Sequence, residues 1–270
     1  RQWSRGLGDV YKRQPLIVHY YDIQRLKEDC DINDNLVKLY KRFSPGPITY
    51  VLKLKNNSKI SKFVTNNKKS IAVRFPKHKL LRNLLKNLDY PVAAPSANIS
   101  SRLSSVKPSD VKEEFGSKIK YILNGGKSKI GVESTILNLL EKPSLLRYGG
   151  LDTKKIENVL KKKLLINTNS KKKLSPGLFP LHYSPGIPLR VNVKKPKKDE
   201  AYLLIKKRKS KLKNYYYLSK MKNIDEAAKN LYSTLRKIKN DGFKKIAVET
   251  IPNKGLGKTI NDRLKRASKY

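Results

Sequence analysis

The feature that most constrains this chain is a series of short motifs in which an apolar, strand-like run meets a turn built on proline or glycine. Proline fixes one backbone dihedral and glycine adopts conformations that other residues avoid, so the chain direction is closely specified at each motif. Such turns can present small polar side chains and backbone amides to a phosphate-rich ligand. The motifs are P-L-I-V-H (15–19), S-P-G-P-I-T (44–49), S-I-A-V-R-F-P (70–76), P-V-A-A-P-S-A-N-I-S (91–100), N-G-G-K-S-K-I-G-V-E-S-T (124–135) and L-R-Y-G-G (146–150).

Strand-like and helical patterns alternate along the first 163 residues, which indicates a mixed α/β domain. In the helix expected at 108–115, Ser109 is the expected cap at the start and Gly116 at the end. The expected strands are 48–54, 70–73, 92–94, 121–123, 134–139 and 144–147, and the expected helices are 35–42, 77–87, 108–115 and 153–163.

The remainder of the chain changes character at 167–188, a stretch with four prolines and no clear period, which is typical of a long linker. Beyond it we expect strands at 201–205, 215–218 and 245–250 and helices at 224–240 and 258–268. This β-β-α-β-α order predicts a compact Rossmann-like lobe.

The composition restricts the partners and the compartment. The formal net charge of +41 indicates either a polyanion partner such as RNA or a lysine-rich surface without a specific role. The lysine runs, such as 161–163 and 171–173, have few interleaved aromatic residues, which favours the second interpretation. Cys30 is the only cysteine, so no disulfide can form within the chain, and we expect a reducing, cytoplasmic location. No apolar run reaches membrane-spanning length.

Four of the motifs occur in an order that is specific when taken together: P-S-A-N (95–98), G-V-E-S-T (131–135), L-R-Y-G-G (146–150) and H-Y-S-P (182–185). In this respect the chain resembles the threonylcarbamoyl-AMP synthase family in its long, two-domain form. The resemblance implies an α/β fold: a YrdC-like twisted mixed sheet with flanking helices, plus a small Rossmann-like α/β C-terminal lobe. The implied divisions are a catalytic domain at 15–163 that lacks its N-terminal part, a linker or lid at 164–195 and the C-terminal domain at 196–270, with 1–14 as a non-native or chimeric segment.

The resemblance also implies an activity. The expected enzyme is a nucleotidyltransferase, L-threonylcarbamoyladenylate synthase, which forms threonylcarbamoyl-AMP and pyrophosphate from L-threonine, bicarbonate and ATP with Mg²⁺. The product would serve threonylcarbamoyladenosine modification of tRNA through a downstream tRNA-modifying transferase complex, and weak binding of tRNA or double-stranded RNA fits the charge. No protein nucleophile is needed, so we expect catalysis by positioning and charge stabilisation, with no catalytic residue and no metal ligand among the side chains.

The resemblance assigns binding roles residue by residue. The expected threonine-binding residues are His19, Arg74, Ser96 and Ser134, and the expected ATP-binding residues are Ser70, Asn98, Arg147 and Tyr183. A guanidinium such as that of Arg74 can bind a carboxylate through two parallel hydrogen bonds. Each of these residues also has an ordinary interpretation: Ser and Asn favour turns, arginines are common at strand ends, and Tyr183 could be an exposed linker aromatic. Gly125, Gly126 and Gly131 either let the backbone approach a ligand or form a plain hairpin.

The chain also departs from the family pattern. An upstream P-T-E-T-V-Y-G-L-G segment is absent, and so is a K-x-R-P-x-x-N element before P-L-I-V-H. Lys12 and Arg13 match that element only in composition, and Val10 and Gln14 stand where an arginine and an asparagine are expected. Ser44 and Ser101 replace a tryptophan and a glycine. Because two cationic phosphate contacts are lost, we expect this chain to turn over poorly.

Two other functions remain open at this point. The first is a basic RNA-binding protein with the same fold and no catalysis. The second is a phosphate-binding loop at Gly257-Lys258-Thr259, which follows a strand and opens a helix. The G-x-x-x-x-G-K-T pattern requires glycine at 252, however, and Pro252 lies there, which argues against this loop.

Overall fold

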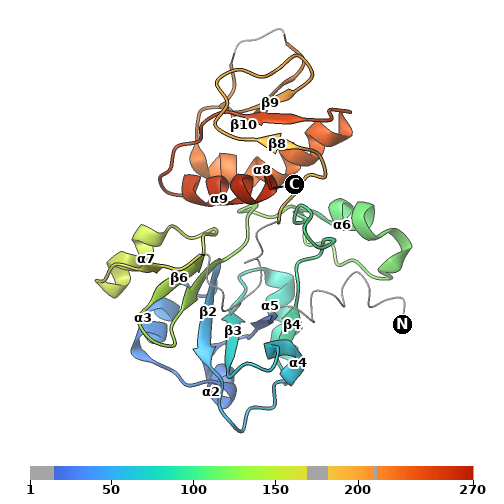
Figure 1. The fold of residues 1–270 in the computed structure, drawn as a ribbon. Coiled ribbons are helices and arrows are strands. Elements are labelled where there is room, and N and C mark those ends of the chain that lie inside the picture. The colour runs from blue at the N-terminus through green and yellow to red at the C-terminus, as the bar shows by residue number, and fades with distance from the viewer. Residues whose placement is uncertain (1–14, 169–181, 209–211, 270) are drawn as a thin grey trace. The chain divides into compact units, whose positions relative to one another are not determined.

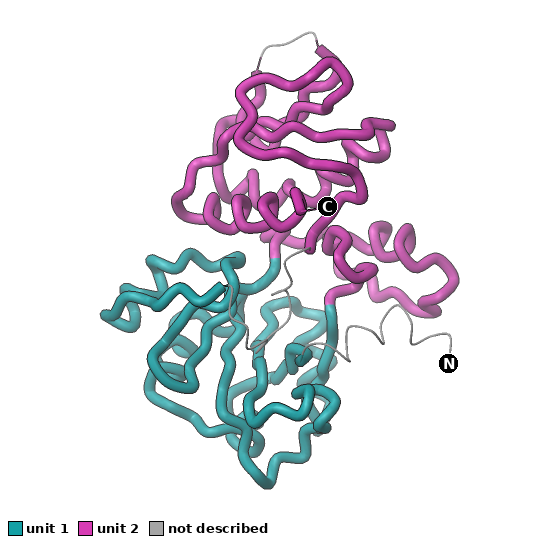
Figure 2. Tube along the Cα trace, viewed as in Figure 1, with its two compact units in different colours: residues 1–95, 133–178 teal, residues 96–132, 179–270 magenta. Residues whose placement is uncertain are grey.

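The computed structural model describes residues 15–168, 182–208 and 212–269. The chain divides into two compact units (Figure 2): unit 1 comprises residues 1–95 and 133–178, and unit 2 comprises residues 96–132 and 179–270. The predicted domain boundaries at 163, 164–195 and 196 remain a prediction, because this division follows contacts and places 96–132 with the C-terminal residues. The segment 1–14 lies outside the described residues, as do residues 169–181 of the predicted linker.

Unit 1 is built on a seven-stranded mixed sheet, as the sequence predicts. Neighbours β1 and β3, β2 and β5, and β6 and β7 run parallel, whereas β4 and β1, β3 and β2, and β5 and β6 run antiparallel. The order across the sheet is β4 (Val92–Ala94), β1 (Ile17–His19), β3 (Ser70–Arg74), β2 (Ile48–Lys53), β5 (Thr135–Asn138), β6 (Ser144–Arg147) and β7 (Leu165–Ile166).

One face of this sheet packs on the main core of unit 1. Its apolar side chains, among them Tyr50 and Val73, are buried with Leu36 of α3 (Asp34–Phe43) and Ile156 of α7 (Thr153–Leu160). Full burial of a side chain of this size stabilises the fold by about 2 kcal/mol. Helices α2 (Ile23–Asp29), α4 (Lys62–Thr65) and α5 (Lys79–Asn87) complete unit 1.

The opposite face of the sheet is different. Alternation along the strands places a small apolar cluster there, made by Val51, Ala72, Ile136 and Leu146. A β-bulge between Ile136 and Leu137 shifts the register of β6, so that Arg147 pairs with Ile136 and shares this face. Polar side chains therefore surround a small apolar patch on the face that the main core does not use.

Unit 2 contains a four-stranded, fully parallel sheet. Helices α8 (Ile224–Asn240) and α9 (Gly257–Ala267) lie side by side on one of its faces (Figure 1), and their apolar residues share one core with the sheet. The side chain of Asn223 caps α8 by accepting hydrogen bonds from two amides of its first turn. The order across the sheet is β10 (Tyr215–Ser219), β9 (Ala201–Lys206), β11 (Ile246–Val248) and β8 (Leu189–Arg190).

The segment 96–132 joins this core. It holds α6 (Pro108–Phe115) and the 3₁₀ turn Gly116–Lys118, and its Leu103 and Val106 are buried in the same cluster as the α8 side chains. Gly131, with φ of +79°, closes the segment; a Cβ there would overlap the backbone of Lys229 in α8. The lack of a side chain at Gly131 therefore allows the segment to pack closely against α8.

The structure confirms most of the predicted elements, including α8 at both ends. Two predictions were wrong. Residues 121–123 form no strand. Helix α6 begins after Lys107 with Pro108 first, and Asp110, rather than Ser109, accepts hydrogen bonds from the Val106 and Lys107 amides. None of the helices that the structure describes combines the length and apolar character that a membrane crossing needs.

Candidate functional site

Five of the eight predicted site residues belong to unit 1, namely His19, Ser70, Arg74, Ser134 and Arg147. His19 and Arg74 end the parallel strands β1 and β3 and pair with each other in register. Because aligned residues of neighbouring strands share a face, both side chains lie on the polar face described above.

Ser134 and Arg147 are joined by direct hydrogen bonds. Arg147 is only 5% exposed, and its Nε and Nη2 donate to the Ser134 carbonyl at 3.2 and 3.0 Å. Nη2 also lies 3.2 Å from the Ser134 Oγ, which is 2.7 Å from the Oγ1 of Thr49. The buried serine hydroxyl is therefore held from two sides.

Close backbone packing explains why the separate motifs meet at Ser134. A Cβ on Gly149 would overlap the backbone of Ser134 and Thr135, so only glycine fits there. The Gly150 amide donates to the Glu133 carbonyl at 2.8 Å, and the Thr135 amide donates to the Pro47 carbonyl at 2.9 Å. Three motifs that are remote in sequence, at 44–49, 131–135 and 146–150, thus form one assembly.

Arg74 lies within the electrostatic influence of this assembly. Its Nε donates to the Gly46 carbonyl at 3.3 Å, which orients the guanidinium. Burial and the like charge of Arg147 lower the pKa of Arg74 to about 10, and Glu133 opposes that shift. Two neighbouring guanidiniums in a partly desolvated place repel each other, and an anion bound beside them would relieve that repulsion.

His19 is neutral at physiological pH. Burial and the positive charge of Arg74 lower its pKa to about 4, although the hydrogen bond to Val92 works in the opposite direction. Its Nδ1 lies 3.2 Å from the Val92 carbonyl oxygen. Since a carbonyl can only accept, the proton is assigned to Nδ1, and Nε2 is left as an acceptor.

Ser70 begins the strand that Arg74 ends. The two residues are four positions apart in β3, so they share a face at a separation of about 13 Å. Ser70 is buried and pairs in register with Lys53 of β2. The structure therefore places Ser70 on the same face as Arg74 but at the opposite end of strand β3.

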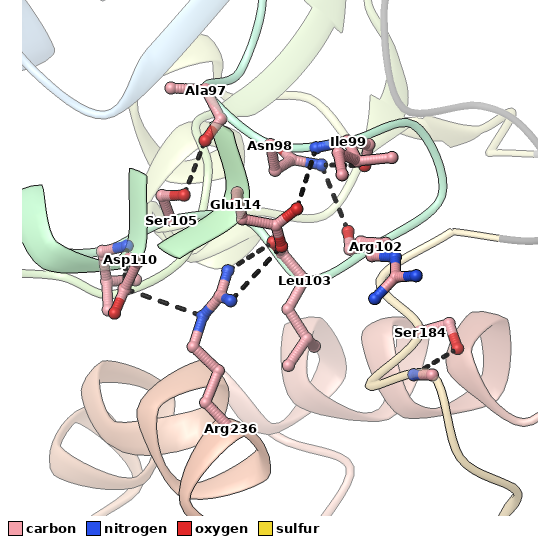
Figure 3. Close-up of polar contacts among 12 residues, drawn as sticks. Ala97, Asn98, Ile99, Arg102, Leu103, Ser105, Asp110, Glu114, Ser184 and Arg236 are labelled. Carbon is pink, nitrogen blue, oxygen red and sulfur yellow. Dashed lines mark hydrogen bonds and ion pairs between the residues drawn. The ribbon is translucent and has the colours of Figure 1, made fainter. Parts of the chain in front are cut away.

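Asn98 and Ser96 belong to unit 2 (Figure 3 shows Asn98). Asn98 is 6% exposed, and its Nδ2 donates to the carbonyls of Ile99 and Arg102 at 2.9 and 3.2 Å. Among the described residues its Oδ1 has no hydrogen-bond partner, which is uncommon for a buried amide. Ser96 is exposed, and its carbonyl accepts from the Asn98 amide at 3.0 Å.

Tyr183 also belongs to unit 2, where its ring is buried rather than exposed on a linker. It stacks on Tyr232 at a centroid distance of 5.8 Å, and the Arg263 guanidinium lies 4.6 Å from the ring centroid. The next amide, that of Ser184, donates to the Ser101 carbonyl at 2.8 Å. The H-Y-S-P motif therefore pairs with the loop that follows Asn98, and the convergence of these residues with Arg74 stays a prediction.

The phosphate-binding-loop alternative finds no support. Gly257 begins α9, and a Cβ there would overlap the Pro252 carbonyl, so helix packing explains the glycine. Thr259 is 2% exposed, which leaves its hydroxyl no open face for a metal–phosphate group. Within residues 15–168, 182–208 and 212–269, no three His, Cys, Asp or Glu side chains gather in a way that could hold a metal ion.

Sequence reasoning missed two residues of this site. Thr49 supplies the hydroxyl that contacts Ser134, and Gly149 permits the close approach of the two backbones. Both lie inside motifs that the sequence shows, S-P-G-P-I-T and L-R-Y-G-G. The sequence therefore contains both residues in recognisable motifs. Their role becomes clear only from the pairing of β2 with β5 in the structure.

Comparison with known proteins gives two family matches that together span most of the chain. A model described as "Telomere recombination", for the Sua5, YciO and YrdC proteins, matches residues 9–149. A model described as "Threonylcarbamoyl-AMP synthase, C-terminal domain" matches residues 151–269.

Individual relatives agree with those matches. Threonylcarbamoyl-AMP synthase of Pyrococcus abyssi is 33% identical over 95% of this chain and 80% of its own length. The Bacillus subtilis protein of the same name is 31% identical over 94% of this chain and 79% of its own. The crystal structure of P. abyssi Sua5 complexed with L-threonine superposes with a TM-score of 0.86 and 31% identity over 96% of this chain and 81% of that one.

Proposed function

Because the chain belongs to the threonylcarbamoyl-AMP synthase family, we propose that it forms threonylcarbamoyl-AMP and pyrophosphate from L-threonine, bicarbonate and ATP. It is a nucleotidyltransferase-type enzyme, and its product serves the threonylcarbamoyladenosine modification of tRNA.

The reaction needs no covalent intermediate with the protein. The amine of threonine forms a C–N bond with bicarbonate, which loses a C–O bond as water leaves, and one oxygen of the resulting carbamate then attacks the α-phosphorus of ATP. The bond from the α-phosphorus to the bridging oxygen breaks, and pyrophosphate leaves with the electron pair. Catalysis then consists of holding the carbamate in line with the phosphorus and of stabilising negative charge.

The observation that carries the proposal is the pair of guanidiniums beside Ser134. Arg74 keeps a charged, partly desolvated head whose pKa is lowered by burial and by the charge of Arg147, so an anion at this place is favoured. A threonine carboxylate at Arg74 would satisfy this, with the buried hydroxyl of Ser134 nearby. Arg147, held by the Ser134 carbonyl, would then stabilise phosphate charge without moving.

His19 fits the threonine side of the site as a neutral acceptor. With the proton on Nδ1 and the carbonyl of Val92 beside it, Nε2 can accept a hydrogen bond from the amine or the hydroxyl of threonine. A lowered pKa keeps this acceptor available at physiological pH. The role is one of orientation, because a group with this pKa is a poor proton donor at pH 7.

Asn98 and Tyr183 of unit 2 would act on the nucleotide. The buried Oδ1 of Asn98 can only accept, so it would meet a ribose hydroxyl or the adenine amino group rather than a phosphate. Ser70 and Tyr183 are further ATP contacts in this proposal, and Ser96 is a threonine contact. The pairing of the Ser101 carbonyl with the Ser184 amide supports a common role for the two loops.

Mg²⁺ would accompany ATP in this proposal. In this proposal phosphate oxygens and water would hold the ion, so it would need no cluster of protein ligands. Bound there, Mg²⁺ would neutralise charge on the departing pyrophosphate. We also place the enzyme in the cytoplasm, because Cys30 is a buried free thiol.

Weak affinity for tRNA or double-stranded RNA is a further part of the proposal, as is a downstream transferase that consumes the labile product. The net charge of +41 supports the first. A salt titration separates this from the rival RNA-binding function. If RNA affinity falls steeply with salt and neither threonine nor ATP binds, the rival is correct.

The proposal is tested by calorimetry with threonine and ATP and by threonine-dependent release of pyrophosphate. Replacement of Arg74 by Ala should abolish the heat of threonine binding, whereas replacement of the exposed Arg42 in the same unit should not. Equal threonine binding by both variants would contradict the placement of the carboxylate. Release of pyrophosphate that does not depend on threonine would contradict the reaction itself.

A further inference from the structure

An arginine from helix α8 holds the loop that carries Asn98. The side chain of Arg236 is 12% exposed and lies beside residues 98–105 (Figure 3). Its Nη2 donates to the Leu103 carbonyl at 2.8 Å, and its Nη1 donates to Oε1 of Glu114 in α6 at 3.3 Å. The Arg236 guanidinium thus bonds both the loop and helix α6. These partners lie 122 or more residues before Arg236 in the chain.

Two buried carboxylates extend this hold to both ends of the loop. The second oxygen of Glu114 accepts from the Ile99 amide at 3.3 Å, directly after Asn98. Asp110 lies 3.7 Å from Nε of Arg236 and accepts from the Val106 amide at 2.8 Å. Because carboxylates that are removed from water need a cation, Arg236 fixes where both of them lie.

The orientation of Asn98 depends on the same loop. Its Nδ2 donates to two loop carbonyls, those of Ile99 and Arg102. A reversed amide would place Oδ1 against these carbonyls, so the bonds fix Oδ1 as the atom on the other side of the amide. The result is a buried acceptor atom without a partner in the described chain. The direction in which Oδ1 points is therefore only as well defined as the positions of the two loop carbonyls.

The surroundings leave the loop room to shift. A hollow of about 160 Å³ lies beside the cluster, and it is lined by Ile99, Leu103 and Glu114 from the segment and by Arg236 and Lys239 from α8. Leu103 packs in the core of unit 2, but Ile99, directly after Asn98, is 37% exposed beside the hollow and lacks that anchor. The contacts of the planar guanidinium hold this part of the loop, and a lysine ammonium cannot reproduce that fork.

We propose that Arg236 is a positioning residue for nucleotide binding, acting through Glu114 and the loop 98–105 to keep Oδ1 of Asn98 aimed at a hydrogen-bond donor of ATP. The proposal rests on the proposed function in that ATP is taken as the ligand of Asn98. It assigns a role in the site to α8, a helix from the part of the chain that the C-terminal family model matches.

The first test compares ATP affinity, measured by calorimetry, in R236K and in K237M. Lys237 is the next residue of α8 and forms a solvent-exposed ion pair with Asp241, so K237M is the matched control. We expect R236K to weaken ATP binding about tenfold and K237M to leave it unchanged. In an N98A background, R236K should add no further loss, because Arg236 acts through Asn98. Unchanged affinity in R236K, or losses that add in the double variant, would overturn the proposal.

A second pair of measurements separates positioning from a loss of folding. Replacing Arg236 with Met, Glu114 with Leu and Asp110 with Asn removes all three charges, so no buried carboxylate of the cluster is left without its cation. That variant should match the thermal midpoint of K237M within a few degrees and still bind ATP about tenfold more weakly. Amide exchange at Ile99 should accelerate in R236K while exchange in β9 and β11 does not; unchanged exchange at Ile99 would overturn the inference. If the unaltered chain binds no ATP, the proposed function itself fails, a result distinct from normal ATP binding by R236K.

Discussion

The protonation state of His19 gives a prediction whose size follows from the structure. Its pKa is lowered from 6.5 to about 4 by burial and by Arg74, so the unfolded chain binds a proton at this residue more readily than the folded chain. The stability that a neutral His19 maintains is therefore present above pH 6.5, falls as the pH drops through the interval from 6.5 to 4, and changes no further below 4. Between pH 7 and pH 5, protonation linked to this one group should lower the free energy of unfolding by about 2 kcal/mol.

The prediction is tested by following the imidazole of His19 by NMR and by urea denaturation at pH 7 and pH 5. The control is H19N, whose side-chain amide can still donate to the Val92 carbonyl but does not titrate. The unaltered chain should lose about 2 kcal/mol more than H19N between the two pH values. A His19 resonance that titrates near pH 6.5, or equal losses in both proteins, would show that the imidazole is not held neutral by its surroundings.

Three further predictions concern other parts of the molecule. Replacement of Arg74 by Lys keeps the charge but loses the two-pronged geometry, so threonine affinity measured by calorimetry should fall about 10- to 100-fold; an unchanged affinity would exclude a bidentate carboxylate there. A methyl group at Gly149 should displace the Ser134 backbone, which would lower the stability by about 2 kcal/mol and reduce threonine binding; an unaltered melting curve would refute this. Replacement of Lys258 by Met should leave ATP binding nearly intact, and a loss of about tenfold would restore the phosphate-loop alternative.

Much of the local structure could be predicted from periodicity and capping. Helix α8 carries a clear 3.6-residue pattern and an asparagine cap, and both of its ends were predicted correctly. The strand expected at 121–123 was wrong for an instructive reason. Its Tyr121 and Leu123 alternate with other residues as a strand would, but both are exposed and no neighbouring strand pairs with them. Alternation indicates which side chains could share a face, and a strand additionally needs a partner.

The site was predictable in its residue types but not in its arrangement. Arg74 follows from a strand-end arginine and the family resemblance, and the structure places it beside Arg147. Their common placement depends on the antiparallel pairing of β2 with β3 and on the bulge in β6 opposite Ile136 and Leu137, which put Arg147 on the same face. Pairing and register arise from long-range packing, so the local sequence does not contain them. The same reason explains why Thr49 was overlooked.

The route of the chain through the two units has a consequence for dissecting the protein. The backbone passes from one unit to the other near residues 95, 132 and 178, so neither unit is a continuous piece of sequence. A fragment cut at about residue 150 would keep Leu103 and Val106 while discarding the helices they pack against. Such a fragment would expose these apolar side chains to water, and exposed apolar surface favours aggregation. To isolate unit 1, the segment 96–132 would therefore have to be removed together with the C-terminal residues. Otherwise the chain is best kept intact.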